Sequence, residues 1–290
     1  MANCRYTYAD VGRFGLGHSL MAWARAAIFA EQQGIPMIAP RWLRLRIGPY
    51  LRRERDKRAY FLFFQSSPWA WFQRLWVLVT YRHVPEGSPL PSGRCVKIFA
   101  NQPVVDQVAE FAAFLPHAEM LRTKLIAMTK PRFRPNRTSD DHVAIHVRLG
   151  DFTAKVAASD LRTGTKNASL PVGWYIAVLT GLRKALGYDI QAIIFSDGED
   201  AALKSLLDVP GVTRAPRQPA ITDMLAIAQA RLLIGSGSGF SLWGAFLGQV
   251  PRISYPGQML ASVLQDKAAE VETLDATDLA ARFLEIVRSR

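Results

Sequence analysis

Beyond residue 141 the sequence alternates between short apolar runs and longer stretches with helical spacing, and this alternation constrains the fold most strongly. The expected strands are His142–Val147, Ile190–Ser196, Val212–Thr213, Leu232–Ile234 and Pro251–Tyr255. The expected helices are Pro171–Leu186, Asp200–Leu207, Ile221–Ala230, Phe240–Leu247 and Leu274–Val287. Strands that alternate with helices form a parallel sheet, which binds ligands at the carboxyl ends of its strands.

The first half of the chain also begins with a pattern that is typical of alternating helices and strands. A glycine-rich turn after Gly12 precedes a helical apolar pattern over residues 20–30. Gly34 ends that pattern, and residues 35–39 predict a short strand. A glycine-rich turn, a helix and a strand in this order are how a Rossmann-like half begins.

Residues 130–141 are proline-punctuated, polar and without periodicity, which indicates a linker. A chain of 290 residues has about the length of two domains. We therefore expect an α/β fold with two Rossmann-like domains, residues 1–135 and 140–290.

Residues 41–81 combine basic and aromatic side chains. Seven arginines fall between positions 41 and 58, and an aromatic run from Tyr60 to Tyr81 follows them. The run has about the length of a membrane span, but Pro68 and Arg74 interrupt it, which argues against a span. We expect a buried helical insertion in the first domain, and a patch that docks on an anionic membrane surface is the second interpretation.

The formal net charge of +12 favours anionic partners, among them nucleic acid, acidic lipid and phosphorylated small molecules. Cys4 and Cys95 give neither a disulfide framework nor a CxxC metal pair; one bridge between them stays open, but a reducing compartment fits them better. Residues 1–10 lack the pattern of a signal peptide. We expect a cytoplasmic protein, with peripheral contact to the inner face of the membrane as an open alternative.

Polar side chains follow three of the expected strands of the second half. They are His146, Arg148 and Asp151 after the first, Ser196 and Asp197 after the next, and the loop Gly235–Gly239 after Leu232–Ile234. Because the carboxyl ends of parallel strands meet at one edge of the sheet, we expect these three loops to form one site.

Arg148 carries the clearest chemistry of this group. A planar guanidinium at a strand end can fork onto phosphate oxygens, and each hydrogen bond to a charged group contributes about 1.5–3 kcal/mol. His146 lies two residues earlier and points to the same face of the strand. The alternative is a structural ion pair between Arg148 and Asp151 across the turn.

The loop Gly235–Gly239 lies between a strand and a helix. Gly237 and Gly239 allow close approach to a ligand, Ser236 and Ser238 add hydroxyl donors, and helix-start N–H groups favour anions. The loop is neither a Walker loop nor a GxGxxG fingerprint. Asp223, expected near the start of the preceding helix, either favours the helix dipole or accepts both donors of a guanine edge.

The five histidines form no HxxxH or HExxH pattern, and no Asp-x-Asp stands at a strand end. We therefore expect neither a bound metal nor another cofactor.

Four segments resemble, in order, the motifs of the superfamily of α1,2-, α1,6- and protein O-fucosyltransferases. Gly12–His18 resembles the amino-terminal Gly-Leu-Gly-Asn-Gln motif, and His146–Phe152 resembles the His-x-Arg-Arg-x-Asp-Tyr signature. Ile194–Asp197 and Asp223–Trp243 resemble the second and third motifs. The resemblance covers most of the chain, from near residue 12 to near residue 250.

The resemblance implies a GT-B fold, in which two Rossmann-like domains face each other across a cleft. It implies inverting, metal-independent transfer of fucose from GDP-fucose to a glycan hydroxyl, with an α1,2-type linkage on a surface polysaccharide or glycolipid. It assigns Arg148 to the β-phosphate, His146 to the nucleoside, Asp223 to guanine, and Ser236 and Ser238 to the phosphates. Gly15, Gly17, Asp151 and Asp197 would support the site, and His18 is a candidate general base.

The sequence departs from the motifs in three places, one of which is Ser238–Trp243, where the usual Ser-Thr-Phe-Ser-Trp-Trp becomes Ser-Gly-Phe-Ser-Leu-Trp. Leu149 replaces the second arginine of the signature, and His18-Ser19 replaces Asn-Gln. A catalytically silent relative that binds a nucleotide or glycan is therefore one alternative. A nucleic-acid-binding protein is another, because of the charge and of the arginines beside aromatics in residues 41–81. The α/β pattern with its own loop site favours the enzyme, with a GDP-sugar and a glycan acceptor as partners and no nucleic acid.

Overall fold

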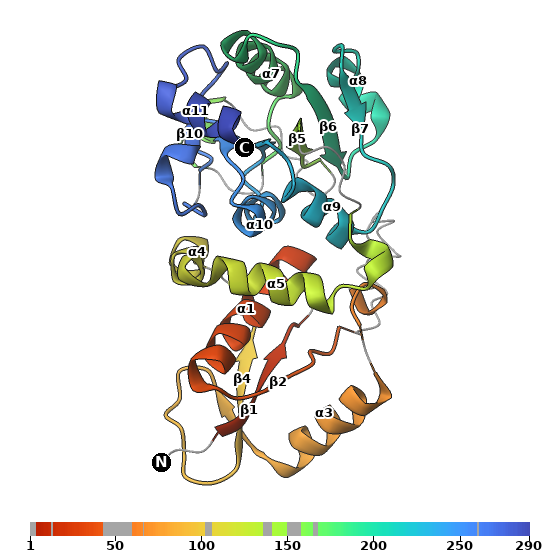
Figure 1. Cartoon of the computed structure of the whole chain (residues 1–290), viewed down its shortest axis with the longest axis vertical. Helices are drawn as coiled ribbons and strands as arrows, with labels where there is room; N and C mark the ends of the chain where they lie inside the picture. Colours follow the sequence, from red (N-terminus) through yellow and green to blue (C-terminus); the bar gives the residue numbers. More distant parts are fainter. Residues whose placement is uncertain are drawn as a thin grey trace. The chain divides into compact units, whose positions relative to one another are not determined.

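The structure of the chain is a computed structural model that describes residues 4–12, 14–42, 60–65, 67–101, 106–135, 141–149, 158–164, 168–259 and 261–290. It divides into two compact units (Figure 1). Unit 1 comprises Met1–Asp106 and Pro116–Phe133, and unit 2 comprises Gln107–Leu115 and Arg134–Arg290. Each unit contains a parallel sheet with helices, so the prediction of an α/β fold with two Rossmann-like halves is confirmed.

Unit 1 is built on a four-stranded parallel sheet in the order β2-β1-β4-β3. Its described elements are β1 (Cys4–Asp10), α1 (Leu16–Gln33), β2 (Met37–Ile38), α3 (Pro68–Thr80), β3 (Arg82–Pro85), β4 (Cys95–Ala100) and α5 (Ala118–Met128), with short 3-10 segments at Tyr60–Leu62 and Pro131–Phe133. Helix α1 packs against β1 and β4. It begins at the predicted glycine turn and ends where Gly34, at a left-handed φ of 60°, donates its N–H to the carbonyls of Ala30 and Glu31.

Helix α3 contradicts the expectation of a buried insertion. Ser67 caps the helix by accepting a hydrogen bond from the N–H of Ala70 (3.0 Å), and Pro68 occupies its first turn. Val77 is buried, but Trp69, Trp71 and Trp76 are exposed, so these aromatic residues are not core. Residues 43–59, which hold most of the arginines of the segment, lie outside the described residues.

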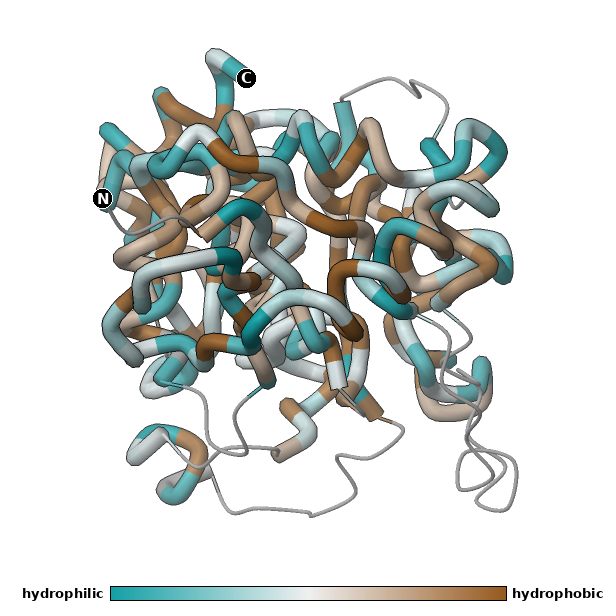
Figure 2. Tube along the Cα trace, turned by 90° about the horizontal axis from the view of Figure 1, so that it is seen from below, coloured by the Kyte–Doolittle hydropathy of each residue, from teal (hydrophilic) through white to brown (hydrophobic). Residues whose placement is uncertain are grey.

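In the described part of the chain, no helix combines the length and the apolar character that a membrane crossing requires. Apolar and polar residues alternate along the trace, as the mixed colouring of Figure 2 shows.

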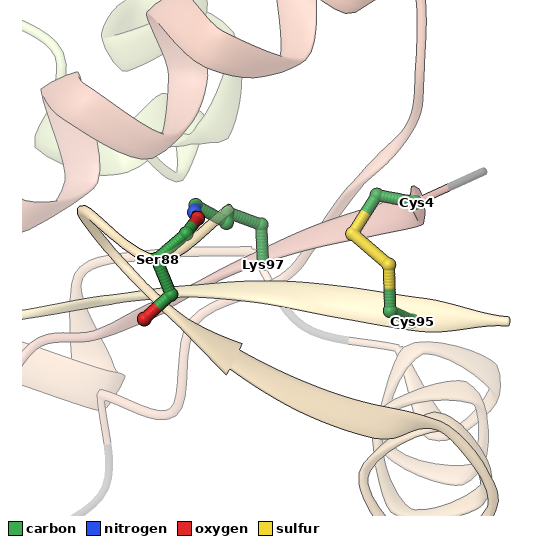
Figure 3. Close-up of a disulfide and its surroundings, with 4 residues drawn as sticks. All are labelled: Cys4, Ser88, Cys95 and Lys97. Carbon is green, nitrogen blue, oxygen red and sulfur yellow. A yellow bond between two sulfur atoms is a disulfide. The ribbon is translucent and has the colours of Figure 1, made fainter. Parts of the chain in front are cut away.

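The two cysteines lie opposite each other in neighbouring strands of unit 1. Cys4 in β1 and Cys95 in β4 are register partners with Cα atoms 4.6 Å apart, and their sulfurs form a disulfide (Figure 3). On the same strand, buried Lys97 donates a hydrogen bond to the carbonyl of Ser88 (2.6 Å). The bridge that the sequence left open is therefore formed. Disulfides are rare in reducing compartments, so the bridge argues against the reducing compartment that the sequence favoured, and the cytoplasmic location stays a prediction.

Unit 2 is built on a six-stranded parallel sheet in the order β10-β9-β8-β5-β6-β7. Its described strands are β5 (His142–Val147), β6 (Gln191–Ser196), β7 (Val212–Arg214), β8 (Leu232–Gly235), β9 (Arg252–Ser254) and β10 (Glu270–Glu272). Its described helices are α4 (Gln107–Phe114), α6 (Ala158–Arg162), α7 (Val172–Leu186), α8 (Asp200–Leu207), α9 (Ala220–Ile227), α10 (Gly239–Gly248) and α11 (Ala281–Ser289), with a 3-10 turn at Lys267–Ala269.

The strand order of unit 2 defines where a ligand can bind. Strand β5 comes first in the sequence and lies in the middle of the sheet, β6 and β7 extend to one side, and β8, β9 and β10 extend to the other. This is the doubly wound Rossmann order, whose direction reverses between β5 and β8. In such sheets the crevice beyond the carboxyl ends of the two strands at the reversal binds ligands.

Two regions differ from the sequence predictions. The structure places residues 107–115 with unit 2, because Phe111 and Phe114 of α4 are buried against Trp243 and Phe246 of α10. The helix expected over residues 274–287 begins only at Ala281, and strand β10, which was not predicted, precedes it.

Candidate active site

Arg148, Asp197 and the serines of the loop Gly235–Gly239 follow neighbouring strands at the reversal point of the unit 2 sheet. His146 of β5 pairs with Gly235 of β8, so Arg148 and Ser236 follow directly on two neighbouring strands. Val147 pairs with Ser196 of β6, which brings Asp197 to the same edge from the other side. The prediction that these three loops meet at one edge of the sheet is therefore confirmed by the strand register.

Asp197 holds Arg148 in place. Its Oδ2 lies 2.7 Å from Nη1 of Arg148, and its Oδ1 accepts a hydrogen bond from the backbone N–H of Leu149 at 2.9 Å. One carboxylate thus fixes both the guanidinium and the backbone that follows it. The alternative partner, Asp151, lies outside the described residues.

Arg214, which the sequence analysis did not select, supports the turn that carries Asp197. Its Nη2 donates to the carbonyls of Ser196 (3.2 Å) and Gly198, and its Nη1 pairs with Asp200. Arg214 stands at the end of β7, 18 residues beyond Ser196, and no local pattern links the two positions. The support is visible only once β6 and β7 are paired.

His146 lies buried beneath the glycine-serine loop. Its Nδ1 is 2.6 Å from Oγ of Ser241 and 3.1 Å from Oγ of Ser236, and its ring stacks on Phe240. The hydroxyl of Tyr175 donates a hydrogen bond to the backbone carbonyl of His146 at 3.3 Å. Burial, together with the positive charge of Arg148, lowers the pKa of His146 to about 4. The imidazole is therefore neutral near pH 7 and orients the serine hydroxyls.

The serines of the loop form a compact hydroxyl cluster at the start of α10. Ser238 caps the helix by accepting the N–H of Ser241 (3.3 Å), and the Oγ atoms of Ser236, Ser238 and Ser241 lie 3.3–3.4 Å from one another. Gly237 lies close against Gln258, where a Cβ atom would meet the carbonyl oxygen at 3.1 Å. Ser241 was not selected from the sequence, although its spacing of three from an N-cap serine is a usable signal.

Helix α10 begins with Gly239 directly at this cluster. The first N–H groups of a helix point out of its end and carry partial positive charge. A guanidinium, hydroxyl donors and a helix start at one sheet edge form a site suited to an anion such as a diphosphate.

Asp223 lies in the first turn of α9, half-buried, and its Oδ1 accepts a hydrogen bond from Nε2 of Gln218 at 2.8 Å. The helix packs closely on α10, since a Cβ atom at Gly244 would clash with Ile227 and one at Gly248 with the carbonyl of Ala228. These glycines therefore fix α9, and Asp223 with it, relative to the helix that follows the serine loop.

The residues selected in the first half lie in unit 1. Gly15 is the N-cap of α1, Gly17 and His18 occupy its first turn, and the His18 ring stacks on Phe14 with centroids 4.1 Å apart. This turn follows β1 and so lies at the carboxyl edge of the unit 1 sheet. The roles of His18, Gly15 and Gly17 in catalysis stay predictions.

Within the described ranges, no three His, Cys, Asp or Glu side chains gather as a metal-binding group would require. The carboxylate of Asp200 is paired with Arg214. Independence of the reaction from metal ions stays a prediction.

Comparison with known proteins gave matches among solved structures alone: no family model and no curated protein matches the chain. POFUT1 in complex with GDP is similar at a TM-score of 0.45, with 12% identity over 88% of this chain and 98% of that chain. The NodZ alpha-1,6-fucosyltransferase soaked with GDP-fucose matches at 0.44, with 16% identity over 87% and 95%. E. coli heptosyltransferase WaaC with ADP matches at 0.46, with 13% identity over 98% of both chains.

Proposed function

We propose that the chain is a GT-B glycosyltransferase that moves fucose from GDP-fucose to a hydroxyl of a glycan acceptor. One observation carries the proposal: Asp197 fixes the guanidinium of Arg148 at the reversal point of a Rossmann-type sheet, next to the serine cluster at the start of α10. Three of the fucosyltransferase-like motifs contribute described residues to this edge, namely Arg148, Asp197 and the serines of the loop Gly235–Gly239, and the amino-terminal motif lies in unit 1.

The chemistry follows from where charge develops. When the bond between the anomeric carbon and the β-phosphate oxygen breaks, the electron pair stays on the diphosphate, and the sugar carbon gains oxocarbenium-like character. Arg148 and the N–H groups at the start of α10 stabilise this leaving charge more than they stabilise the intact donor, which lowers the barrier. In the inverting transfer that we propose, an acceptor oxygen attacks from the opposite face and loses its proton to a general base.

His146 acts as a positioning residue in this scheme. A neutral, buried imidazole adds no charge of its own, but it holds the hydroxyls of Ser236 and Ser241 in fixed orientations. Fixed donors stabilise a developing anion without reorganising during the reaction. Contact of His146 with the nucleoside stays a proposal from the family resemblance.

Asp223 would select the base of the donor. A carboxylate can accept both N1–H and the exocyclic amine of guanine, whereas uracil and adenine do not offer that pair of donors. Gln218 holds one carboxylate oxygen by a hydrogen bond, which orients the group.

Unit 1 would bind the acceptor, with His18 at the carboxyl edge of its sheet as candidate general base. We further propose an α1,2-type linkage on a surface polysaccharide or glycolipid. The transfer would be independent of metal ions, and the protein would contact the inner face of a membrane.

Ligand-induced thermal stabilisation tests the donor assignment directly. The melting temperature should rise with GDP and GDP-fucose at about 100 times their Kd, where binding adds about 2.7 kcal/mol to the free energy of unfolding. It should rise less with UDP and ADP at the same concentrations. Release of GDP from GDP-fucose then distinguishes an enzyme from a silent relative. Equal stabilisation by all nucleotides, or none by any, would remove the guanine-donor proposal.

A matched control is Arg231→Ala. Arg231 pairs with Asp141 at 2.8 Å at the opposite end of β5 and also donates to the carbonyls of Val287 and Arg288, so its loss removes an ion pair and two hydrogen bonds away from the proposed donor site. Arg148→Ala should abolish most of the stabilisation by GDP, and Arg231→Ala should retain it.

A further inference from the structure

Helix α3 exposes an apolar surface. Of the eleven large hydrophobic side chains that are exposed in the described part of the chain, six lie on this one helix. They are Trp69, Trp71, Phe72, Leu75, Trp76 and Val79, each between 49% and 76% exposed, and we call them the α3 face. A cluster of large apolar residues on one exposed surface usually marks an interaction site, whereas scattered ones do not.

The helix is oriented with its apolar side outward. At 100° per residue the α3 face spans an arc of about 160°. The opposite side carries Val77, which is buried, together with half-buried Gln73 and Arg74, whose Nη1 donates to the carbonyl of Ala39 at 3.3 Å. Val77 packs with Ile38 and Tyr81 in unit 1. The protein thus attaches α3 through the side around Val77 and leaves the wider apolar side exposed.

The composition of the α3 face fits the boundary between water and lipid. Three of its six residues are tryptophans, which favour the interfacial zone because their rings are apolar and carry one polar N–H. A helix of 13 residues is about 20 Å long, too short to cross a hydrocarbon core of about 30 Å, so it would lie in the plane of the surface.

Charge favours an anionic surface as the occupant rather than a second copy of this chain. Residues 41–58, which precede α3 in the sequence, contain eight Lys and Arg and two Asp and Glu, a net of +6 out of +12 for the whole chain. Arg82, just after the helix, is exposed. Two copies of a chain with a net charge of +12 repel each other, whereas an acidic bilayer attracts each of them.

We propose that α3 docks this protein on anionic lipid bilayers, with Trp69, Trp71 and Trp76 in the interfacial zone. Docking requires no nucleotide, so it stands independently of the proposed donor chemistry. It would deliver the enzyme to an acceptor that carries a lipid.

Intrinsic fluorescence of the whole protein is a direct test, because the tryptophans divide cleanly. Trp69, Trp71 and Trp76 are exposed, whereas the other four, Trp23, Trp42, Trp174 and Trp243, are buried. Vesicles of phosphatidylglycerol and phosphatidylcholine in equal parts should shift the emission to the blue, and brominated phosphatidylcholine in the same vesicles should quench it. Pure phosphatidylcholine should bind at least about tenfold more weakly, since each basic residue near an acidic surface contributes about fivefold.

Substitution identifies the surface. Trp69→Gln combined with Trp76→Gln should lower the partition coefficient by about tenfold or more, because two large apolar groups no longer enter the interface. Glutamine is a good helix former, so α3 should persist, which circular dichroism melting checks. The matched control Tyr188→Gln changes an aromatic residue of unit 2 that is 43% exposed, and it should bind vesicles as the wild type does.

Three results would overturn the proposal. The first is no blue shift with acidic vesicles at low salt. The second is equal binding by the wild type and by the folded double variant. The third is a dimer in sedimentation that dissociates on substitution of the α3 face while vesicle binding is absent, which would assign the surface to a second copy.

Discussion

Asp197→Asn tests whether the guanidinium of Arg148 acts on the leaving diphosphate. Asparagine keeps the size of the side chain, and its carbonyl oxygen can still accept the N–H of Leu149, but the charge opposite Arg148 is gone. The change is best measured in a cycle of four proteins: wild type, Arg148→Ala, Asp197→Asn and the double variant.

The contacts set the size of each effect. Arg148→Ala removes a positioned donor to the leaving group, which costs about 3–4 kcal/mol in the transition state and lowers kcat by 10²–10³-fold. The pair of Asp197 and Arg148 is worth about 1.5–3 kcal/mol as a charged hydrogen bond. Its side chains are 23% and 30% exposed, so solvent screening reduces this to about 1 kcal/mol, about fivefold in rate.

The effect of Asp197→Asn on activity should change sign when Arg148 is already replaced by alanine. Without Arg148, the carboxylate of Asp197 is left unpaired near the position of the diphosphate and repels it. Adding Asp197→Asn to Arg148→Ala should therefore cost nothing or restore up to about fivefold activity. Arg148→Lys should recover little, because an ammonium group lacks the planar fork.

Release of GDP from GDP-fucose gives kcat and KM for each protein, and calorimetry with GDP separates binding from chemistry. An interaction made mainly in the transition state lowers kcat more than it raises KM. Arg231→Ala is the control and should behave as the wild type. Effects that multiply in the double variant, or an Arg148→Ala enzyme within threefold of the wild-type kcat, would refute the reasoning.

Four further predictions follow from the described contacts. Asp223→Asn should weaken GDP binding by about 1–3 kcal/mol and leave UDP binding unchanged, as calorimetry would show; equal losses for both would contradict guanine selection. Because burial lowers the pKa of His146 to about 4 from an ordinary 6.5, the unfolded chain takes up this proton first as the pH falls. The stability that His146 contributes is thus complete above pH 6.5, and about 3 kcal/mol is lost by pH 4 in denaturant titrations, a slope that His146→Gln should remove. Exhaustive chelation should leave turnover unchanged, and rescue by manganese or magnesium would contradict this. Thiol titration of the unfolded, unreduced protein should find no free thiol, and Cys95→Ser should reduce the free energy of unfolding by about 4 kcal/mol; two titratable thiols would exclude the bridge to Cys4.

The second half of the fold could be predicted closely because its signals are local. Strand β5 and helix α8 have the predicted bounds, since polar turns flank both. The predicted helix over residues 274–287 fails at residues 274–280 for a local reason that the hydropathy pattern does not show. Asp275 accepts the N–H of Thr277 in a turn, and Ala276 has a left-handed φ of 57°, so the apolar spacing there belongs to an irregular segment.

The errors in unit 1 have a different origin. Hydropathy predicts that the tryptophans of α3 are buried, because burial is what usually follows from an apolar helix of this length. Which side of a helix meets the sheet depends on the packing of Val77 with Ile38, and a one-dimensional pattern does not encode it. The contact between His146 and Ser241 spans 95 residues and is inaccessible to sequence reasoning for the same reason.

Leu149 stands where the fucosyltransferase signature has a second arginine, and this leaves Arg148 as the one arginine of that motif in the proposed site. The Leu149 side chain is half-buried, packs on the core of unit 2 and contacts Gly198, where a Cβ atom would clash with it. The turn Asp197–Gly198 therefore does two things: its carboxylate holds Arg148, and its glycine leaves room for leucine where the family signature has a second arginine. Arg214, a further described guanidinium at this edge, is engaged by Asp200 and by the carbonyls of Ser196 and Gly198. In the proposed reaction, neutralisation of the leaving diphosphate would depend on Arg148 and the start of α10, which is why we expect the largest kinetic loss at this one residue.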